Sequence, residues 1–208
     1  MVKDEKIVKS PLYIGSYIRW TYVNKYLPKL AGGLLLDVGA GQCDYKPLVE
    51  SKGYTYEGID IDEQSPAKKG SILDIPYKDN TFDVLICIDV LEHIKDHEKA
   101  ISELYRVLRE GGLLLIHVPN KNQKHILFDS PEEHDEHERE GYTPFDIQHL
   151  FYDFQNPVWY PTFNEMECVA WDISHALLHN KGININNMLN IKKGETWEHY
   201  GWMIIARK

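Results

Sequence analysis

The chain has 208 residues, of which 43% are hydrophobic and 26% are charged, and its formal net charge is −9. This length favours a single domain with a substantial apolar core, and the acidic balance argues against nucleic-acid binding, which requires a basic face. No apolar run is long enough to span a bilayer, and the charged N-terminus has no signal-peptide core. We therefore expect a cytoplasmic protein.

Apolar periodicity and glycine or proline boundaries predict an alternating series of helices and strands. In chain order we expect a helix within residues 12–30 that lies outside the main sheet, a strand at 34–38, a helix at 45–52, strands at 54–59, 70–73 and 82–88, a helix at 96–109 capped by Gly111-Gly112, a strand at 113–118, helices opening at Thr143-Pro144 and spanning 171–180, and a strand at 200–206. Strands that are apolar throughout and alternate with helices indicate an α/β fold with a doubly wound, mostly parallel sheet.

The most informative segment is LLLDVGAGQCD at residues 34–44, where a buried strand runs directly into Gly39 and Gly41. Glycines at this point let the backbone turn sharply and approach a ligand closely. Asp60 lies nineteen residues after Gly41, at the end of the second strand. An acid in that place binds the ribose hydroxyls in doubly wound nucleotide sites.

Two cofactors compete for this segment. A dinucleotide site favours a third glycine and places a pyrophosphate on the helix N-terminus, whereas this chain has Asp44 at the glycine position and Asp37 at the tip of the first strand. Two carboxylates repel a pyrophosphate. They suit the ammonium and sulfonium of S-adenosylmethionine, which has no phosphate.

These segments resemble the motifs of class I S-adenosylmethionine-dependent methyltransferases of the small-molecule type. The matching stretches are DVGAG at 37–41, YEGID at 56–60, DIP at 74–76, DNTFDV at 79–84, LEHI at 91–94 and LREGGL at 108–113. Cys43 stands where many relatives have a third glycine. The resemblance covers residues 34–119 and implies a seven-stranded sheet whose last strand is antiparallel.

The resemblance also implies a role for each cofactor-binding residue. Asp37, Gly39 and Gly41 would cradle the methionine and ribose, Asp60 would hold the ribose hydroxyls, Ile61 would pack on adenine, Asp74 and the Ile75 amide would meet the adenine edge, and Ile88 and Asp89 would contact the methionine end. The N-terminal helix would be a lid over the site. Its Arg19 would pair with the methionine carboxylate.

The acceptor side is less defined. The stretch HERE-G-YT at 137–143 resembles the H-x-R-E-Y-T stretch of small-molecule methyltransferases, with Gly141 inserted, and implies that His137 lines the acceptor pocket together with His117. We take these two histidines as candidate bases. The segment 132–138 has residue types that could bind a divalent cation, and a solvated loop is the alternative. The sequence does not decide between them, so no metal ligand is assigned. His93 is open between a core position and a role near the ligand.

We therefore predict a single methyltransferase domain, 1–208. It would comprise an N-terminal helical lid at 1–31, a cofactor-binding core at 34–119 and an acceptor-side half at 120–208. The predicted activity is methyl transfer to a small-molecule acceptor. We expect no nucleic-acid partner and no membrane span. The alternatives are a dinucleotide-dependent oxidoreductase and a non-catalytic relative that binds the cofactor. The acceptor, the methylated atom and the oligomeric state do not follow from the sequence.

Overall fold

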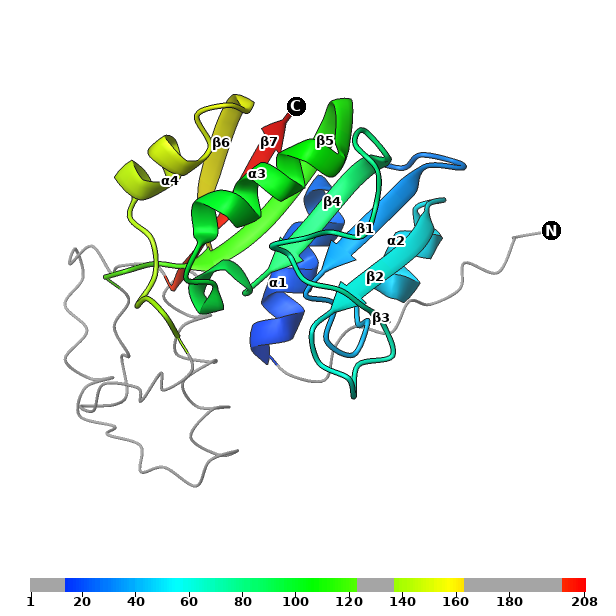
Figure 1. Cartoon of the computed structure of the whole chain (residues 1–208), viewed down its shortest axis with the longest axis horizontal. Helices are drawn as coiled ribbons and strands as arrows, with labels where there is room; N and C mark the ends of the chain where they lie inside the picture. Colours follow the sequence, from blue (N-terminus) through cyan, green and yellow to red (C-terminus); the bar gives the residue numbers. More distant parts are fainter. Residues whose placement is uncertain (1–13, 123–136, 163–199) are drawn as a thin grey trace.

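The computed structural model describes residues 14–122, 137–162 and 200–208, which form one seven-stranded sheet (Figure 1). The strands lie in the order β3-β2-β1-β4-β5-β7-β6. Their bounds are β1 Leu34–Val38, β2 Thr55–Asp60, β3 Lys68–Lys69, β4 Phe82–Ile88, β5 Leu108–Pro119, β6 Gln155–Thr162 and β7 Gly201–Arg207. Neighbouring strands pair in parallel, except that β7 is antiparallel to both β5 and β6. The predicted doubly wound sheet with an antiparallel last strand is confirmed.

Helices cover both faces of the sheet. They are α1 Ile14–Tyr26, α2 Lys46–Ser51, the short 3-10 helix η1 Leu91–His93, α3 His97–Val107 and α4 Pro144–Leu150. Val23 of α1 and Leu48 of α2 share a buried cluster with Leu35, while Leu104 of α3 and Ile147 of α4 belong to the cluster on the opposite face. Figure 1 accordingly shows α3 in front of the sheet and α1 behind it. The direction of winding changes between β1 and β4, where doubly wound folds bind ligands.

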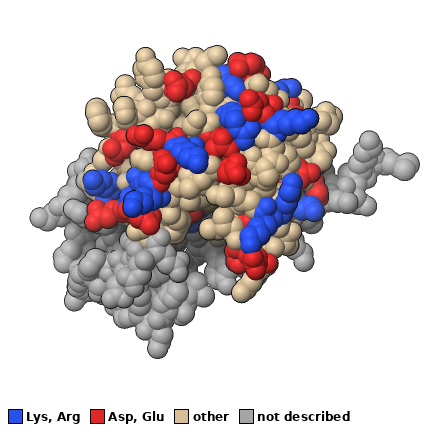
Figure 2. Space-filling model, viewed as in Figure 1, with Lys and Arg blue, Asp and Glu red and all other residues tan. Residues whose placement is uncertain are grey.

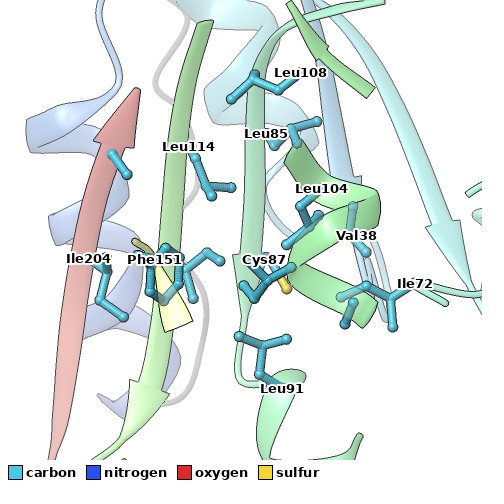
Figure 3. Packing of buried hydrophobic residues seen from close by; sticks show 14 of the residues in the cluster. Val38, Ile72, Leu85, Cys87, Leu91, Leu104, Leu108, Leu114, Phe151 and Ile204 are labelled. Atoms are coloured by element: carbon cyan, nitrogen blue, oxygen red, sulfur yellow. The ribbon is translucent and has the colours of Figure 1, made fainter. Parts of the chain in front are cut away.

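Side chains from α3 close the larger of the two clusters (Figure 3). The helix begins at Asp96, whose carboxylate accepts a hydrogen bond of 3.1 Å from the Lys99 amide. Its apolar residues recur at helical spacing, so Ala100, Ile101, Leu104 and Val107 all face the sheet and are buried. Truncating a fully buried leucine such as Leu104 costs about 2–5 kcal/mol in such a core.

The third strand is shorter than predicted and lies before residues 70–73. Only Lys68 and Lys69 pair with the end of β2, and the chain then turns through a bridge between Ser71 and Asp74. The Gly70 amide still donates to the Asp60 carbonyl, at 2.9 Å. Short, lysine-bearing edge strands protect a sheet from further pairing, and they carry no apolar signature.

The prediction that Gly111-Gly112 caps the helix at 96–109 is wrong. α3 ends at Val107, and Leu108 is already extended and paired with Phe82. Gly111 has φ +71, and its amide donates to the Lys208 carbonyl at 2.9 Å. The glycine pair therefore lies within the irregular first part of β5, against the end of β7.

Strand β6 is absent from the sequence-based prediction. Pro157 and Pro161 lie within it, and proline cannot donate to a β ladder. The strand tolerates them because it is at the sheet edge and pairs only with β7. Its proline content hides it from any search for uninterrupted β-formers.

The N-terminal helix lies outside the sheet, as predicted, and packs on one of its faces. Ile18, Val23 and Leu27 are at most 4% exposed. α1 is therefore a covering layer, and its movement as a lid stays a prediction. By contrast, the predicted start at Thr143-Pro144 is confirmed by a capping box with Asp146. The predicted helix 171–180 lies outside the described residues.

Acidic and basic side chains intermingle on the surface drawn in Figure 2. This face thus carries no continuous basic stripe among the described residues, in agreement with the overall acidic charge. Within the part of the chain that the structure describes, no helix is long and apolar enough to cross a membrane.

Candidate functional site

The glycine turn after β1 requires residues without side chains. Gly39 has φ +72, and a Cβ atom there would lie 2.3 Å from Val90 Cγ2. The amides of Gly39 and Ala40 both donate to the Ile59 carbonyl, at 2.9 and 3.0 Å. The turn is thereby bound to the end of β2. This arrangement bears out the expectation of a sharp turn at glycine, and the close approach of a ligand stays a prediction.

Asp60 lies directly beside this turn. One carboxylate oxygen accepts a hydrogen bond of 2.8 Å from the Gly41 amide, and the other accepts one of 2.8 Å from the Asp62 amide. The glycine turn and the acid at the end of the second strand therefore lie side by side, and the ribose-binding role of Asp60 stays a prediction. The neighbouring Ile61 is 68% exposed, although it is large and apolar. An exposed apolar side chain at a strand tip offers a surface on which a flat ring can pack.

Cys43 adopts a backbone conformation that glycine favours. Its φ is +60, in the left-handed region. Cys43 therefore keeps a backbone conformation that the glycine expected here from the resemblance would also adopt. A left-handed non-glycine residue costs about 1–2 kcal/mol, which the short hydrogen-bonded turn from Ala40 to Lys46 sustains.

Asp37 is a buried carboxylate with a neutral partner. It is 2% exposed and accepts a hydrogen bond of 2.7 Å from the Tyr56 hydroxyl. Burial raises its pKa to about 7; the Tyr56 hydrogen bond opposes the rise, and the nearby charges of Asp60 and Asp44 add to it. The sequence motif indicated Asp37 but not Tyr56. The parallel register, in which Leu35 lies opposite Tyr56 and Asp37 opposite Gly58, brings the hydroxyl into reach.

Asp89 is a second carboxylate, at the tip of β4, and it has charged partners. Its two oxygens face Arg19 Nε from α1 and His117 Nδ1 from β5. Burial opposes ionisation, but Arg19 and His117 outweigh it and lower the pKa of Asp89 to about 2. His117 Nε2 lies 2.9 Å from the Thr162 hydroxyl oxygen, so the network continues to β6. Thr162 gave no signal in the sequence.

The geometry argues against the predicted role of His117 as a base for the acceptor. Its side chain is buried, both ring nitrogens have hydrogen-bond partners, and a Cβ on Gly201 would lie 2.6 Å from the ring. Burial also lowers the pKa of His117, although Asp89 opposes the shift. His117 therefore positions Asp89. Arg19, predicted to meet the methionine carboxylate, is held by the same aspartate, and Ile88 is half-buried just before it.

The structure gives the Ile75 amide a different partner from the predicted one. This amide donates to Glu103 Oε2 of α3 at 2.8 Å, so it does not face an adenine ring nitrogen. Asp74 is exposed, and its own amide donates to the Ser71 carbonyl at 3.2 Å. The two residues help to line an open hollow of about 620 Å³. None of its lining residues belongs to the glycine turn: Asp74, Ile75, Pro76, Tyr77, Lys78, Thr81, Glu103 and Arg106.

His137 lies against η1, next to Glu92 and His93. The rings of His93 and His137 meet edge to face, with centroids 4.5 Å apart, and the Glu138 amide donates to the Glu92 carbonyl at 2.9 Å. His93 is exposed, so it is not a core residue. Glu92 is 2% exposed, and burial together with Asp89 raises its pKa to about 8. The sequence gave no reason to single out Glu92.

The inserted Gly141 has a structural reason. Its φ is +146, and a Cβ atom there would lie 2.7 Å from the backbone of Asn120 and Lys121. Across this contact the Tyr142 amide donates to the Pro119 carbonyl at 2.9 Å, and the Lys121 amide donates to the Tyr142 carbonyl at 3.2 Å. The glycine therefore lets the 137–143 stretch close against the end of β5.

Comparison with known proteins agrees with this geometry. Residues 36–116, less than half of the chain, match the family model of the methyltransferase domain. An uncharacterized protein of Methanocaldococcus jannaschii is 36% identical over 95 residues, covering 43% of this chain and 42% of that protein. The ubiquinone biosynthesis O-methyltransferase of Pseudomonas entomophila is 29% identical over 140 residues, covering 60% of each chain. The chain thus spans between 42% and 60% of the length of these curated relatives.

Among solved structures, phosphoethanolamine N-methyltransferase 2 of Haemonchus contortus, in complex with S-adenosyl-L-methionine, superposes with a TM-score of 0.69 at 15% identity. The match covers 96% of this chain and 54% of that one, and at this identity it shows the fold alone. Strand order and glycine turn define the class as a Rossmann-like methyltransferase fold. With the match of residues 36–116 to the methyltransferase-domain model, they make the chain similar to class I S-adenosylmethionine-dependent methyltransferases. The comparisons give no support to a dinucleotide-dependent oxidoreductase.

Proposed function

We propose that the protein binds S-adenosylmethionine at the carboxyl ends of β1, β2 and β4 and transfers its methyl group to a small-molecule acceptor. The observation that carries the proposal is the joining of the glycine turn to Asp60 through the Gly41 amide, at 2.8 Å. This contact supports the proposal, because Asp60, the acid proposed to bind the ribose, is held next to a turn that a ligand could approach closely.

The charge around the turn selects this cofactor over a dinucleotide. Asp37 is buried at the turn and Asp44 lies seven residues later in the chain. Both carboxylates make the potential around the turn more negative. A pyrophosphate in this place would be repelled, whereas the ammonium of the methionine end would be attracted. Tyr56 is neutral and the neighbouring Asp60 and Asp44 are acidic, so none of them is a positive partner for Asp37. The ammonium would supply that partner.

The reaction asks little chemistry of the protein. The methyl group moves by in-line displacement from a sulfonium, which leaves as a neutral thioether, so the protein mainly supplies proximity and alignment. A base is required only when the acceptor is a hydroxyl or an ammonium at neutral pH. Of the two predicted histidines, His137 is the one whose position beside η1 leaves this role open. Arg19 from α1 and Asp89 from the tip of β4 would meet the methionine end.

Calorimetric titration of the full chain with S-adenosylhomocysteine tests the proposal, with NAD as the competing ligand. We expect a dissociation constant near 1 µM, or about 8 kcal/mol, for the first and no heat for the second. Asp60→Ala removes an acceptor for two hydroxyls and should weaken binding about ten- to a hundredfold. Asp62→Ala is the matched control, because this acid is exposed and lies two residues away. Equal effects of the two variants, or binding of NAD alone, would refute the proposal.

A further inference from the structure

Three metal-ligating side chains meet beside η1. Glu92 and His93 come from η1, and His137 comes from the segment before α4, more than forty residues later in the chain. One ligand atom of each residue lies within 4.8 Å of the others. Ligand atoms that each lie about 2.1 Å from a tetrahedral ion are about 3.4 Å apart, so the cluster needs to contract by at most about 1.4 Å.

A second observation at the same place also indicates a cation. Glu92 is 2% exposed, yet its Oε2 atom has no hydrogen-bond partner among the described residues. A buried carboxylate oxygen without a partner is costly, because it has lost water and gained nothing in return. A metal ion next to Oε2 would remove that cost. Contact between the two histidine rings alone would leave it in place.

The segment that carries His137 is attached by residues that are not part of the cluster. Arg139 donates to the Ile94 and Lys95 carbonyls at 2.8 and 3.0 Å, and the Tyr142 hydroxyl donates to the Leu91 carbonyl at 3.0 Å. These contacts hold the His137 segment to both ends of η1. The three side chains are thus arranged before any ion binds, as a specific site requires.

We propose that Glu92, His93 and His137 bind one divalent cation of the borderline class, for which Zn²⁺ is the first choice. Two imidazole nitrogens and one carboxylate oxygen form a donor set that suits Zn²⁺ and its first-row neighbours better than Mg²⁺ or Ca²⁺, which prefer oxygen alone. Asp89 is not a ligand, because Arg19 and His117 hold it. The role of His137 is then to bind the ion, and it replaces the role of base.

The site has a consequence that rests on the proposed function. Three protein ligands leave coordination positions open for water or for an oxygen of the acceptor. An ion there would lower the pKa of a bound hydroxyl and orient it, three residues beyond the tip of β4. This points to an acceptor with a hydroxyl group and to methylation at oxygen. The ion site itself does not depend on this consequence.

The test is titration of the chelator-treated full chain with Zn²⁺, and with Co²⁺ as a spectroscopic probe, in the absence of cofactor. We expect one ion per chain, and Glu92→Gln, His93→Ala and His137→Ala should each weaken binding at least about tenfold. His149→Ala is the matched control, since this histidine is exposed on α4, and it should bind as the wild type does. Visible Co²⁺ absorption should change in the three cluster variants only.

The result that overturns the proposal is no binding, or binding that all three cluster variants retain. Circular dichroism and thermal unfolding check that each variant is folded. If the alanine variants do not fold, Glu92→Gln still tests the site, because it preserves the size of the side chain. In the wild type Zn²⁺ should raise the melting temperature, and in His93→Ala it should not. S-adenosylhomocysteine binding is measured separately. A failure of the proposed function therefore leaves the ion result intact, and the reverse also holds.

Discussion

Two aspartates lie at the tips of neighbouring strands and have opposite electrostatic environments. Asp37 is the residue before the end of β1 and lies beside a neutral hydroxyl and two further acids, and burial raises its pKa to about 7. Asp89 follows β4 between an arginine and a histidine, which lower its pKa to about 2 in spite of its burial. The two strands are paired directly, so the contrast arises between adjacent strands of the sheet.

The difference is in the counter-charge. The protein supplies positive partners for the Asp89 carboxylate and none for the Asp37 carboxylate among the groups that shift its pKa. Asp89 has its counter-charge within the protein, so its ionised form stabilises the fold and fixes Arg19 and His117. Asp37 is held near neutrality by burial and lacks a positive partner among the groups that shift its pKa. A cationic ligand would complete the Asp37 environment, whereas it would add little at Asp89.

The largest effect expected from this comparison is on stability. Asp89→Ala leaves Arg19 and the buried His117 without their anion, and it places alanine at φ +54. We expect the free energy of unfolding to fall by about 3 kcal/mol, the lower end for a broken buried pair because both charges are partly exposed. Urea unfolding measures it. Asparagine tolerates the left-handed backbone, so Asp89→Asn removes only the charge and should lower the free energy of unfolding by less. A loss under about 1 kcal/mol for Asp89→Ala would contradict the assignment.

This network shows where sequence reasoning reached its limit. The glycine turn, Asp37 and Asp60 were predicted because their spacing along the chain is fixed by one strand-turn-helix-strand unit. The partners Tyr56 and Thr162 were not, because the first depends on strand register and the second on an edge strand interrupted by prolines. Contacts between elements far apart in the chain leave no local pattern.

The same limit explains the errors in the fold and on the adenine side. The bounds of β1, β2, β4 and β7 were predicted to within one residue because these strands are mostly apolar, whereas β5 begins at Leu108, five residues before its predicted start. The third strand and β6 were misplaced or missed because edge strands bury little apolar surface. The Ile75 amide was assigned to adenine by resemblance, but Glu103, 28 residues later, accepts its hydrogen bond in this chain.

The next prediction concerns cofactor affinity and leaves stability nearly unchanged. Asp37→Asn keeps the shape of the side chain and its contact with Tyr56 but cannot ionise. If Asp37 meets the ammonium of the methionine end, the dissociation constant of S-adenosylhomocysteine should rise about ten- to a hundredfold. The unfolding free energy should stay level or increase slightly, since a buried charge is removed. Equal affinity for the variant and the wild type would show that Asp37 has only a structural role.

A pair of glycine variants tests whether the turn and the tip of β4 are packed together. In Gly39→Ala the new Cβ would lie 2.3 Å from Val90, the residue after Asp89, and φ is +72. We expect a loss of about 2–3 kcal/mol in unfolding free energy. Gly41→Ala is the control, because its φ is +49 and its Cβ would meet nothing within 4 Å, so only about 1 kcal/mol of backbone strain applies. Thermal and urea unfolding of both variants would decide, and equal losses would show that the Val90 contact is unimportant.

The smallest and most specific effect is a pH dependence of cofactor binding. The pKa of Asp37 is about 7 because of its burial and the charges of Asp60 and Asp44, which outweigh the Tyr56 hydrogen bond. A bound ammonium favours the ionised form, so the pKa of Asp37 in the complex must be lower than in the free protein, and binding releases a proton. Affinity for S-adenosylhomocysteine should therefore be level just above pH 7 and fall as the pH drops below it, by up to about tenfold per pH unit. Calorimetry between about pH 5.5 and 7.5 measures the profile. This range lies above the ordinary pKa of carboxylic acids and includes that of histidine. Asp37→Asn should flatten it, and a profile that is unchanged in this variant would assign the pH dependence to another group, such as an exposed histidine.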